Sequence, residues 1–205
     1  RCFYAETLPN PALRVFPIKE VSDIGRKHNI PLIRDNTAAP VICKPLEHGA
    51  AVVVHSLTKF IGGHGTVIGG ALVDGGNFDW TADPKRQPLF NEPDASYGGA
   101  KWGEVVPQLT GANVSFAVRA RVCLLRDLGA PLAPDNAWGI IQGLETAPLR
   151  MKQHCSNAQK VVDFLTKHKS VERVIYPTLH KGEIAERSKT VSYTHLRANE
   201  TNVDL

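Results

Sequence analysis

Cysteine is scarce in this sequence of 205 residues, and no two cysteines lie close together. The four cysteines, Cys2, Cys43, Cys123 and Cys155, form no C-x-x-C motif. A small secreted protein held by disulfides carries more cysteine, and a thiolate zinc site needs short-range pairs. We therefore expect free thiols in a reducing compartment, with the cytoplasm as the location.

Long apolar runs and blocks of like charge are also missing. No stretch of about eighteen apolar residues could span a bilayer, and no apolar leader ends in a small-residue cleavage site. The net charge is +4, but basic residues are interspersed with acidic ones and form no aromatic-interleaved stripe. These absences argue against a membrane or a nucleic acid as partner. With 42% hydrophobic and 21% charged residues, the composition is that of a globular protein.

The most informative feature is a β-branched run that ends in hydroxyls, a lysine and glycines. Residues 51–65 read AVVVHSLTKFIGGHG, and the short apolar segment predicts a buried strand. Lys59 follows it, and a lysine held at the end of a parallel strand is suited to form a Schiff base with a carbonyl compound. Ser56 and Thr58 flank this lysine, where two hydroxyls and nearby backbone N–H groups are suited to hold a phosphate.

A carboxylate ends the preceding apolar run. Residues 30–35 predict a second short strand, and Asp35 stands 24 residues before Lys59. Because ligands of open α/β sheets bind at the carboxyl ends of the strands, we expect both groups at one edge. An aspartate can pair with a protonated pyridine nitrogen, and a lysine can carry an aldehyde. The pattern therefore predicts a pyridoxal 5'-phosphate site.

Three other interpretations of these residues compete with that prediction. A lysine after a strand is most often a solvated surface residue. A nucleotide-binding loop would need the order G-x-x-x-x-G-K-[ST], whereas Lys59 precedes its glycines. A metal site would draw on His55 and His64 with Glu47 or His48, but their spacing matches no zinc pattern, so we expect no metal.

Taken together, the motifs resemble those of a known family. Residues 35–37 (DNT), 47–50 (EHGA) and 55–64 (HSLTKFIGGH) are similar to the Cys/Met-metabolism family of fold-type-I pyridoxal phosphate enzymes. The resemblance runs from about Glu6 to about Lys189. It implies an α/β fold with a mostly parallel sheet flanked by helices.

The resemblance also implies a role for each matching residue. Lys59 corresponds to the catalytic lysine that forms the Schiff base and moves protons. Asp35 corresponds to the partner of the pyridinium nitrogen. Ser56 and Thr58 correspond to phosphate ligands, and Asn10 corresponds to the contact with the ring oxygen. Thr37 is expected to support Asp35 or the ring. From the residues alone, Asn10 between two prolines would be a simple turn residue.

The activity that the resemblance implies is γ-replacement on an amino acid. An insertion rich in glycine, proline and aromatic residues, at 75–113, is more similar to the sulfhydrylases of the family than to its cystathionine synthases and lyases. The expected reaction joins sulfide to O-acetyl-L-homoserine and gives L-homocysteine and acetate, in a homo-oligomer such as a tetramer built from dimers. Cystathionine synthesis, γ-elimination and a non-catalytic remnant stay open as alternatives.

The remaining elements follow from apolar periodicity and turn residues. We expect helices at 17–29, 115–128 and 151–168, strands at 66–74 and 171–177, and a long loop at 75–113. Arg34 does not fit, because a guanidinium in a strand buried on both faces is costly unless it pairs. It either pairs with Asp35 or a ligand phosphate, or it is a sequence error or a damaging variant.

The expected organisation is that of an incomplete two-domain enzyme. Residues 1–150 would form part of the cofactor-binding large domain, 151–190 the linking helix and the start of the C-terminal small domain, and 191–205 a non-native tail. The family takes some phosphate ligands from a neighbouring subunit and binds the substrate carboxylate with an arginine of the C-terminal domain. Neither lies in this chain, so we expect the chain alone to be inactive.

Overall fold

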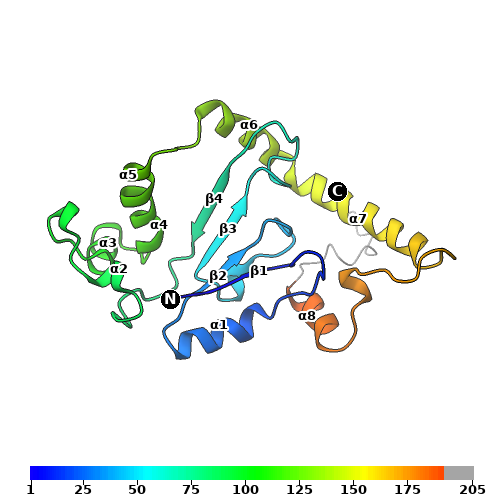
Figure 1. The fold of residues 1–205 in the computed structure, drawn as a ribbon, viewed down its shortest axis with the longest axis horizontal. Helices are drawn as coiled ribbons and strands as arrows, with labels where there is room; N and C mark the ends of the chain where they lie inside the picture. The colour runs from blue at the N-terminus through cyan, green and yellow to red at the C-terminus, as the bar shows by residue number, and fades with distance from the viewer. Residues whose placement is uncertain (192–205) are drawn as a thin grey trace, which may run out of the picture.

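The computed structural model describes residues 1–191, apart from the side chains of residues 190 and 191, and has an α/β fold (Figure 1). Four strands form one sheet in chain order: β1 (Phe3–Glu6), β2 (Leu32–Asp35), β3 (Val52–Ser56) and β4 (Gly70–Asp74). The first three strands are parallel, and β4 is antiparallel to β3. The mostly parallel sheet that the sequence predicts is confirmed.

Helices flank the sheet and extend from it (Figure 1). In chain order they are α1 (Ile18–Lys27), α2 (Pro88–Asn91), α3 (Trp102–Thr110), α4 (Ser115–Arg119), α5 (Arg126–Leu128), α6 (Pro134–Glu145), α7 (Ala147–Leu165) and α8 (Glu183–Val191). A π-helical segment, η3 (Ala120–Leu125), joins α4 to α5, and 3₁₀ turns form η1 (Pro45–His48), η2 (Ala95–Tyr97) and η4 (Pro177–Leu179). The helices expected at 17–29, 115–128 and 151–168 are confirmed, with shifted ends.

Two apolar clusters lie on opposite faces of the sheet. Successive side chains of a strand point to opposite faces, so Val53 joins one cluster and Val52 the other. The first cluster, around Ile18 and Leu32, lies under α1 and also includes Met151 of α7. The second cluster is aromatic and is built from Phe78, Trp80, Phe90 and Trp102. The two clusters therefore cover the strands from both sides.

The long loop expected at 75–113 is wrong in part. It contains α2, η2 and the nine-residue helix α3, because its aromatic residues pack instead of facing solvent. The Trp80 ring lies 4.9 Å from Phe78, 4.5 Å from Phe90 and 5.3 Å from Phe116, measured between centroids. Such a cluster supplies the burial that holds short helices in place.

The strand expected at 171–177 is wrong. Residues 171–176 form no regular element, and Pro177 begins the turn η4. A strand needs a neighbour, but this segment leaves α7 and runs back toward the loop after β1, where His180 Nε2 contacts the Leu13 carbonyl oxygen at 3.1 Å. Alternating apolar residues without a strand beside them do not form a sheet.

Arg34 is fully buried, with 0% of its surface exposed, as the strand position requires. Arg34 and Asp35 are neighbours in β2 and therefore point to opposite faces, so the pairing with Asp35, one of the alternatives given above, does not form. Within residues 1–191 its three guanidinium nitrogens have no hydrogen-bond acceptor, and Cζ lies 3.8 Å from the centre of the Phe16 ring. Burial lowers the pKa of Arg34 to about 10.

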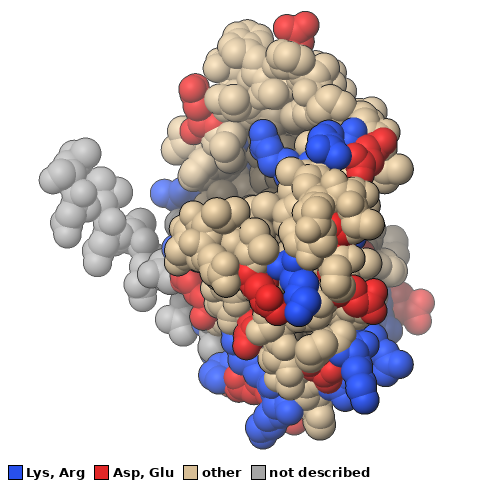
Figure 2. Space-filling model, turned by 90° about the vertical axis from the view of Figure 1, so that its left-hand side faces the viewer, with Lys and Arg blue, Asp and Glu red and all other residues tan. Residues whose placement is uncertain are grey.

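The surface of the described chain carries mixed charge. Figure 2 shows basic and acidic side chains interspersed over one side of the molecule. No helix within residues 1–191 has the length and apolarity needed to cross a membrane. Residues 192–205, nearly all of the expected non-native tail, lie outside the part that the structure describes.

Candidate functional site

The carboxyl ends of β1, β2 and β3 lie at one edge of the sheet, because these strands are parallel. β2 ends at Asp35 and β3 ends at Ser56, and Asp35 stands opposite Val54 in the register. Neighbouring strands are about 4.8 Å apart, so groups that leave these ends share a small space. The structure thus brings Asp35 and the segment from Ser56 to Lys59 to the same edge.

Asp35 is half-buried, and both of its carboxylate oxygens accept hydrogen bonds. Oδ2 accepts one from the Tyr4 hydroxyl at 3.2 Å, and Oδ1 accepts one from the Thr37 amide at 2.9 Å. Thr37 Oγ1 in turn accepts one from the Ser56 amide at 2.7 Å. Burial and the Asp35 carboxylate raise the pKa of Tyr4, so its hydroxyl stays protonated and donates. These bonds fix the carboxylate across three strands.

Lys59 lies in a tight turn directly after β3. The Lys59 amide donates to Ser56 O at 3.3 Å, and the Lys59 carbonyl accepts from the Gly63 amide at 2.8 Å. Thr58 Oγ1 both donates to Gly69 O at 3.3 Å and accepts from Gly69 N at 3.1 Å, which holds the turn against the residue before β4. The Lys59 side chain is exposed, and within residues 1–191 its ammonium forms no hydrogen bond or ion pair. The backbone is therefore fixed while the amine is available.

The other expected cofactor contacts, Ser56, Thr58 and Asn10, differ in whether their side chains are free and near Asp35. Ser56 Oγ has no hydrogen-bond partner within residues 1–191, so it is available to a ligand, whereas Thr58 Oγ1 is engaged with the backbone. Asn10 lies in the turn after β1, at the same edge, but its side chain is exposed and is linked to none of the other site residues. The structure therefore groups Asp35, Ser56 and Lys59 and leaves Asn10 apart.

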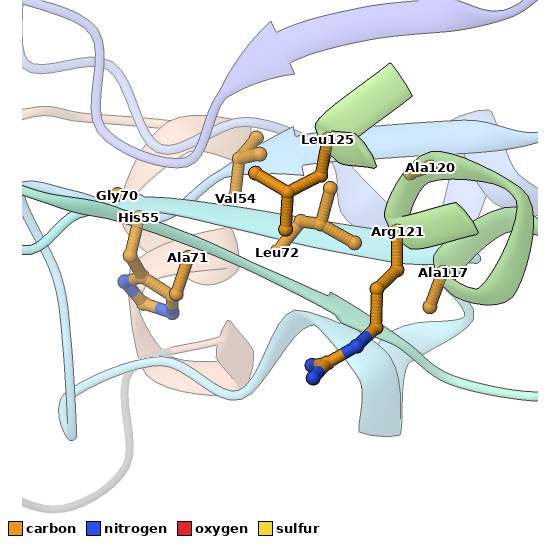
Figure 3. A pocket seen from close by; sticks show the side chains of 9 residues that line it. All are labelled: Val54, His55, Gly70, Ala71, Leu72, Ala117, Ala120, Arg121 and Leu125. Atoms are coloured by element: carbon orange, nitrogen blue, oxygen red, sulfur yellow. The ribbon is translucent and has the colours of Figure 1, made fainter. Parts of the chain in front are cut away.

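A cavity of about 610 Å³ opens beside this edge, between the end of β3, the start of β4 and the helical segment α4–η3 (Figure 3). Its walls are mostly apolar, and Val54 and Leu72 face it from the side of the sheet that carries Asp35. His55 also lines it, and His55 Nδ1 is buried without a partner within residues 1–191. Burial lowers the pKa of His55, although the nearby Asp35 carboxylate opposes this shift. His55 is therefore neutral at physiological pH.

Two residues of this region have no local signal in the sequence. Tyr4 reaches Asp35 diagonally across the β1–β2 register, which becomes visible only when the two strands are aligned. Arg150 of α7 bonds the backbone just after Lys59, across 90 residues of sequence. Within the described part of the chain, no group of three or more His, Cys, Asp or Glu side chains is arranged to hold a metal ion.

Comparison with known proteins identifies the family of this chain. Residues 1–195 match the model of the Cys/Met metabolism PLP-dependent enzymes, where PLP is pyridoxal phosphate. The chain belongs to this family. The O-acetyl-L-homoserine sulfhydrylase of Leptospira meyeri is 51% identical over 183 residues, which are 87% of this chain and 41% of that protein.

Solved structures of Cys/Met metabolism enzymes share the fold. A Campylobacter jejuni structure, described as an O-acetylhomoserine (thiol)-lyase with a pyridoxyl-lysine phosphate, superposes with a TM-score of 0.83 at 37% identity and covers 94% of this chain and 45% of its own. The cystathionine gamma-lyase of Lactobacillus plantarum gives 0.68 at 26% identity, covering 94% and 41%. The chain thus spans about two fifths of the length of the relatives it matches.

Proposed function

We propose that this chain contributes the cofactor site of an enzyme that catalyses the pyridoxal phosphate-dependent replacement of the acetyl group of O-acetyl-L-homoserine by sulfide, which yields L-homocysteine and acetate; the chain alone is expected to be inactive. One observation carries this proposal: an anchored carboxylate, Asp35, and a lysine without a partner among the described residues, Lys59, leave the carboxyl ends of adjacent parallel strands. The names of the similar proteins, O-acetyl-L-homoserine sulfhydrylase and O-acetylhomoserine (thiol)-lyase, support the choice of substrate.

The donor set of this edge fits pyridoxal phosphate. The cofactor offers an aldehyde, a basic ring nitrogen and a phosphate. The free amine of Lys59 suits the aldehyde, the half-buried Asp35 carboxylate suits a protonated nitrogen, and Ser56 Oγ suits the phosphate. Thr58 would reach the phosphate only by giving up its bond to Gly69, and Asn10 would reach the ring oxygen only from its exposed turn. Lys59, Asp35 and Ser56 are therefore the residues that we assign first.

The chain's own groups would divide the proton chemistry between them. When bound, pyridoxal phosphate supplies the electron sink for a carbanion at the substrate's α-carbon. Lys59 Nζ would hold the cofactor and then, when free, take a proton from one substrate carbon and return it to another. Asp35 would hold the positive charge on the ring nitrogen, and its bonds from Tyr4 and Thr37 would keep the carboxylate in place.

Several finer statements belong to this proposal. Sulfide is the proposed co-substrate, a homo-oligomer the proposed assembly and the cytoplasm the proposed location. We also propose the domain division of the sequence analysis, with residues 1–150 in the large domain and 151–190 leading into the small one. A cystathionine synthase or γ-lyase reaction is the second candidate, since the Lactobacillus enzyme shares the fold, but its TM-score and identity are lower.

The test of the cofactor site is borohydride reduction of the purified protein after incubation with pyridoxal phosphate, followed by peptide mapping. We expect one pyridoxyl group on Lys59, its loss in Lys59→Ala and its retention in Lys85→Ala, which removes an exposed lysine outside the site. Circular dichroism confirms the fold of each variant. Adducts scattered over surface lysines of folded protein would refute the assignment.

The role of Asp35 has its own test. Asp35→Asn keeps the shape of the side chain but removes the charge that balances a protonated ring nitrogen. In an enzyme that also carries the substrate-binding domain, we expect hydrogen exchange at the substrate's α-carbon to fall by about 100-fold or more, while cofactor capture falls less, because a preorganised electrostatic contact contributes on this scale. Nuclear magnetic resonance in deuterium oxide measures the exchange. Equal loss of capture and exchange would contradict the role that we give Asp35.

A further inference from the structure

The guanidinium of Arg150 connects α7 to the turn that carries Lys59. Arg150 lies in the first turn of α7, close to the joint with α6. Its nitrogens donate four hydrogen bonds, to Phe60 O at 2.7 Å, Ile61 O at 2.9 Å, Gly143 O at 2.6 Å and Thr146 Oγ1 at 3.1 Å. Two of the acceptors follow Lys59 directly, and the other two belong to the α6–α7 joint. One planar group thus binds both segments.

Close glycine contacts surround this guanidinium. A Cβ atom at Gly143 of α6 would overlap the Gly62 carbonyl oxygen, and one at Gly63 would overlap the Arg150 guanidinium. Gly63 also has a φ of +74°, a backbone conformation that residues other than glycine rarely adopt. The Phe60 ring lies 5.8 Å from the His154 ring of α7. The turn after Lys59 is therefore seated against both helices.

These contacts bear directly on the position of the lysine. A hydrogen bond from a charged donor is stronger than a neutral one, and a planar fork fixes orientation as well as distance. The carbonyls of Phe60 and Ile61 are held by Arg150, and the Lys59 carbonyl is held by the Gly63 amide at 2.8 Å. Three successive peptide groups after the lysine are thus fixed, so the Cα of Lys59 has little freedom.

We propose that Arg150 is a positioning residue for Lys59, an inference that rests on the proposed function. Arg150 does not touch the reacting atoms; it fixes the backbone from which the Lys59 amine extends. Reactions that need a defined approach lose rate when a group is displaced by about 1 Å. Loss of the Arg150 bonds should therefore slow the attack of Lys59 on the cofactor aldehyde in a protein that is still folded.

The test compares Arg150→Met, Arg150→Lys and the control Arg173→Met in the full chain with pyridoxal phosphate. Arg173 is exposed and lies outside the site. Three readouts apply: amide hydrogen exchange of residues 59–63, the rate of the borohydride-trapped adduct on Lys59, and the pH midpoint of the absorbance of bound cofactor. For Arg150→Met we expect exchange about tenfold faster, because charge-assisted bonds are lost, an adduct rate at least about tenfold lower, and a moved midpoint.

The conservative variant separates positioning from stability. Arg150→Lys keeps one charged donor and should restore part of the adduct rate and the midpoint, whereas Arg173→Met should match the wild type. Unchanged adduct rate and midpoint in a folded Arg150→Met protein would overturn the proposal. If that variant does not fold, Arg150→Lys and Thr146→Val, which removes one of the four bonds, decide in the same way. A wild-type chain without any Lys59 adduct would instead refute the proposed function.

Discussion

Two arginines of this chain occupy opposite kinds of surroundings. Arg150 donates four hydrogen bonds to oxygen acceptors at the joint of α6 and α7. Arg34, at the centre of the sheet, is more deeply buried and has no acceptor within residues 1–191. A buried guanidinium stabilises a structure only when oxygens replace the water it has lost. Arg150 therefore organises its region, and Arg34 weakens the sheet.

The Arg34 side of this comparison predicts the largest effect. Burial lowers the pKa of Arg34 from 12.5 to about 10, and a shift of this size corresponds to about 3 kcal/mol. Arg34→Leu should raise the free energy of unfolding by about 3 kcal/mol, because it removes a buried charge that has an aromatic contact but no hydrogen-bond acceptor within residues 1–191. Urea unfolding followed by circular dichroism measures the change. Arg34→Lys keeps a charge and should give no such gain; a loss of stability in Arg34→Leu would show that the guanidinium is satisfied.

The Arg150 side should respond in the opposite direction. Arg150→Met leaves the carbonyls of Phe60, Ile61 and Gly143 without their donor. A bond from a charged donor contributes about 1.5–3 kcal/mol, but Arg150 is only half-buried, so water can replace much of what these carbonyls lose. We expect the free energy of unfolding to fall by about 2 kcal/mol, measured by the same urea titration. A higher free energy of unfolding in Arg150→Met would mean that Arg150, like Arg34, destabilises the fold, which would contradict the contrast between the two arginines.

His55 tests the Arg34 face of the sheet through pH, because the two side chains project from the same face. Burial lowers the pKa of His55 below its ordinary 6.5. As the pH falls below 6.5, His55 takes up a proton in the unfolded chain before it does so in the folded protein. The stability that neutral His55 contributes is therefore fully present above pH 6.5, and it decreases as the pH falls toward the lower pKa of the folded state.

His55→Gln should make the free energy of unfolding depend less on pH below pH 6.5. One proton contributes at most about 1.4 kcal/mol per pH unit to the slope. Urea midpoints measured at intervals between pH 7 and pH 5 give the slope for wild type and variant. Equal slopes would show that His55 is hydrated or paired in the folded protein.

The smallest expected effect concerns a single bond at the α6–α7 joint. Thr146→Val removes the acceptor of Arg150 Nε, at 3.1 Å, and leaves the three carbonyl bonds. This bond is the longest of the four and is exposed to solvent, so it should contribute less than a well-placed bond from a charged donor, and the free energy of unfolding should fall by about 1 kcal/mol or less. Thermal unfolding monitored at 222 nm detects it. A loss as large as that of Arg150→Met would show that the bonds act as one unit.

Features that depend on local sequence patterns were predictable, whereas those that depend on long-range contacts were not. The α/β class, the strands that end at Asp35 and Ser56, and the long helices follow from local patterns of apolar residues and glycines. The assignment of Asp35 and Lys59 to one edge follows from the parallel order of strands. These features depend on residues that lie near one another in the chain.

Long-range contacts account for what local patterns do not show. The bond from Tyr4 to Asp35 depends on the alignment of two strands 29 residues apart, and that from Arg150 to Phe60 spans 90 residues. Residues 171–176 have a strand-like pattern but no neighbouring strand. The helices inside 75–113 depend on the packing of Trp80 among other aromatic rings. Each case is decided by a partner that the local sequence does not contain.

The order of strands in the sheet has a consequence for synthesis of the protein. Every strand pairs with its neighbour in the sequence, and the last of the four ends at Asp74. Chains fold from their N-terminal side as they leave the ribosome, so all four strands are available once residue 74 has emerged, and the aromatic cluster that covers one face follows with residues 78–123. Arg150 emerges much later and only then closes onto the turn of Lys59. We therefore expect the turn that carries Lys59 to be the last part of this sheet edge to become ordered.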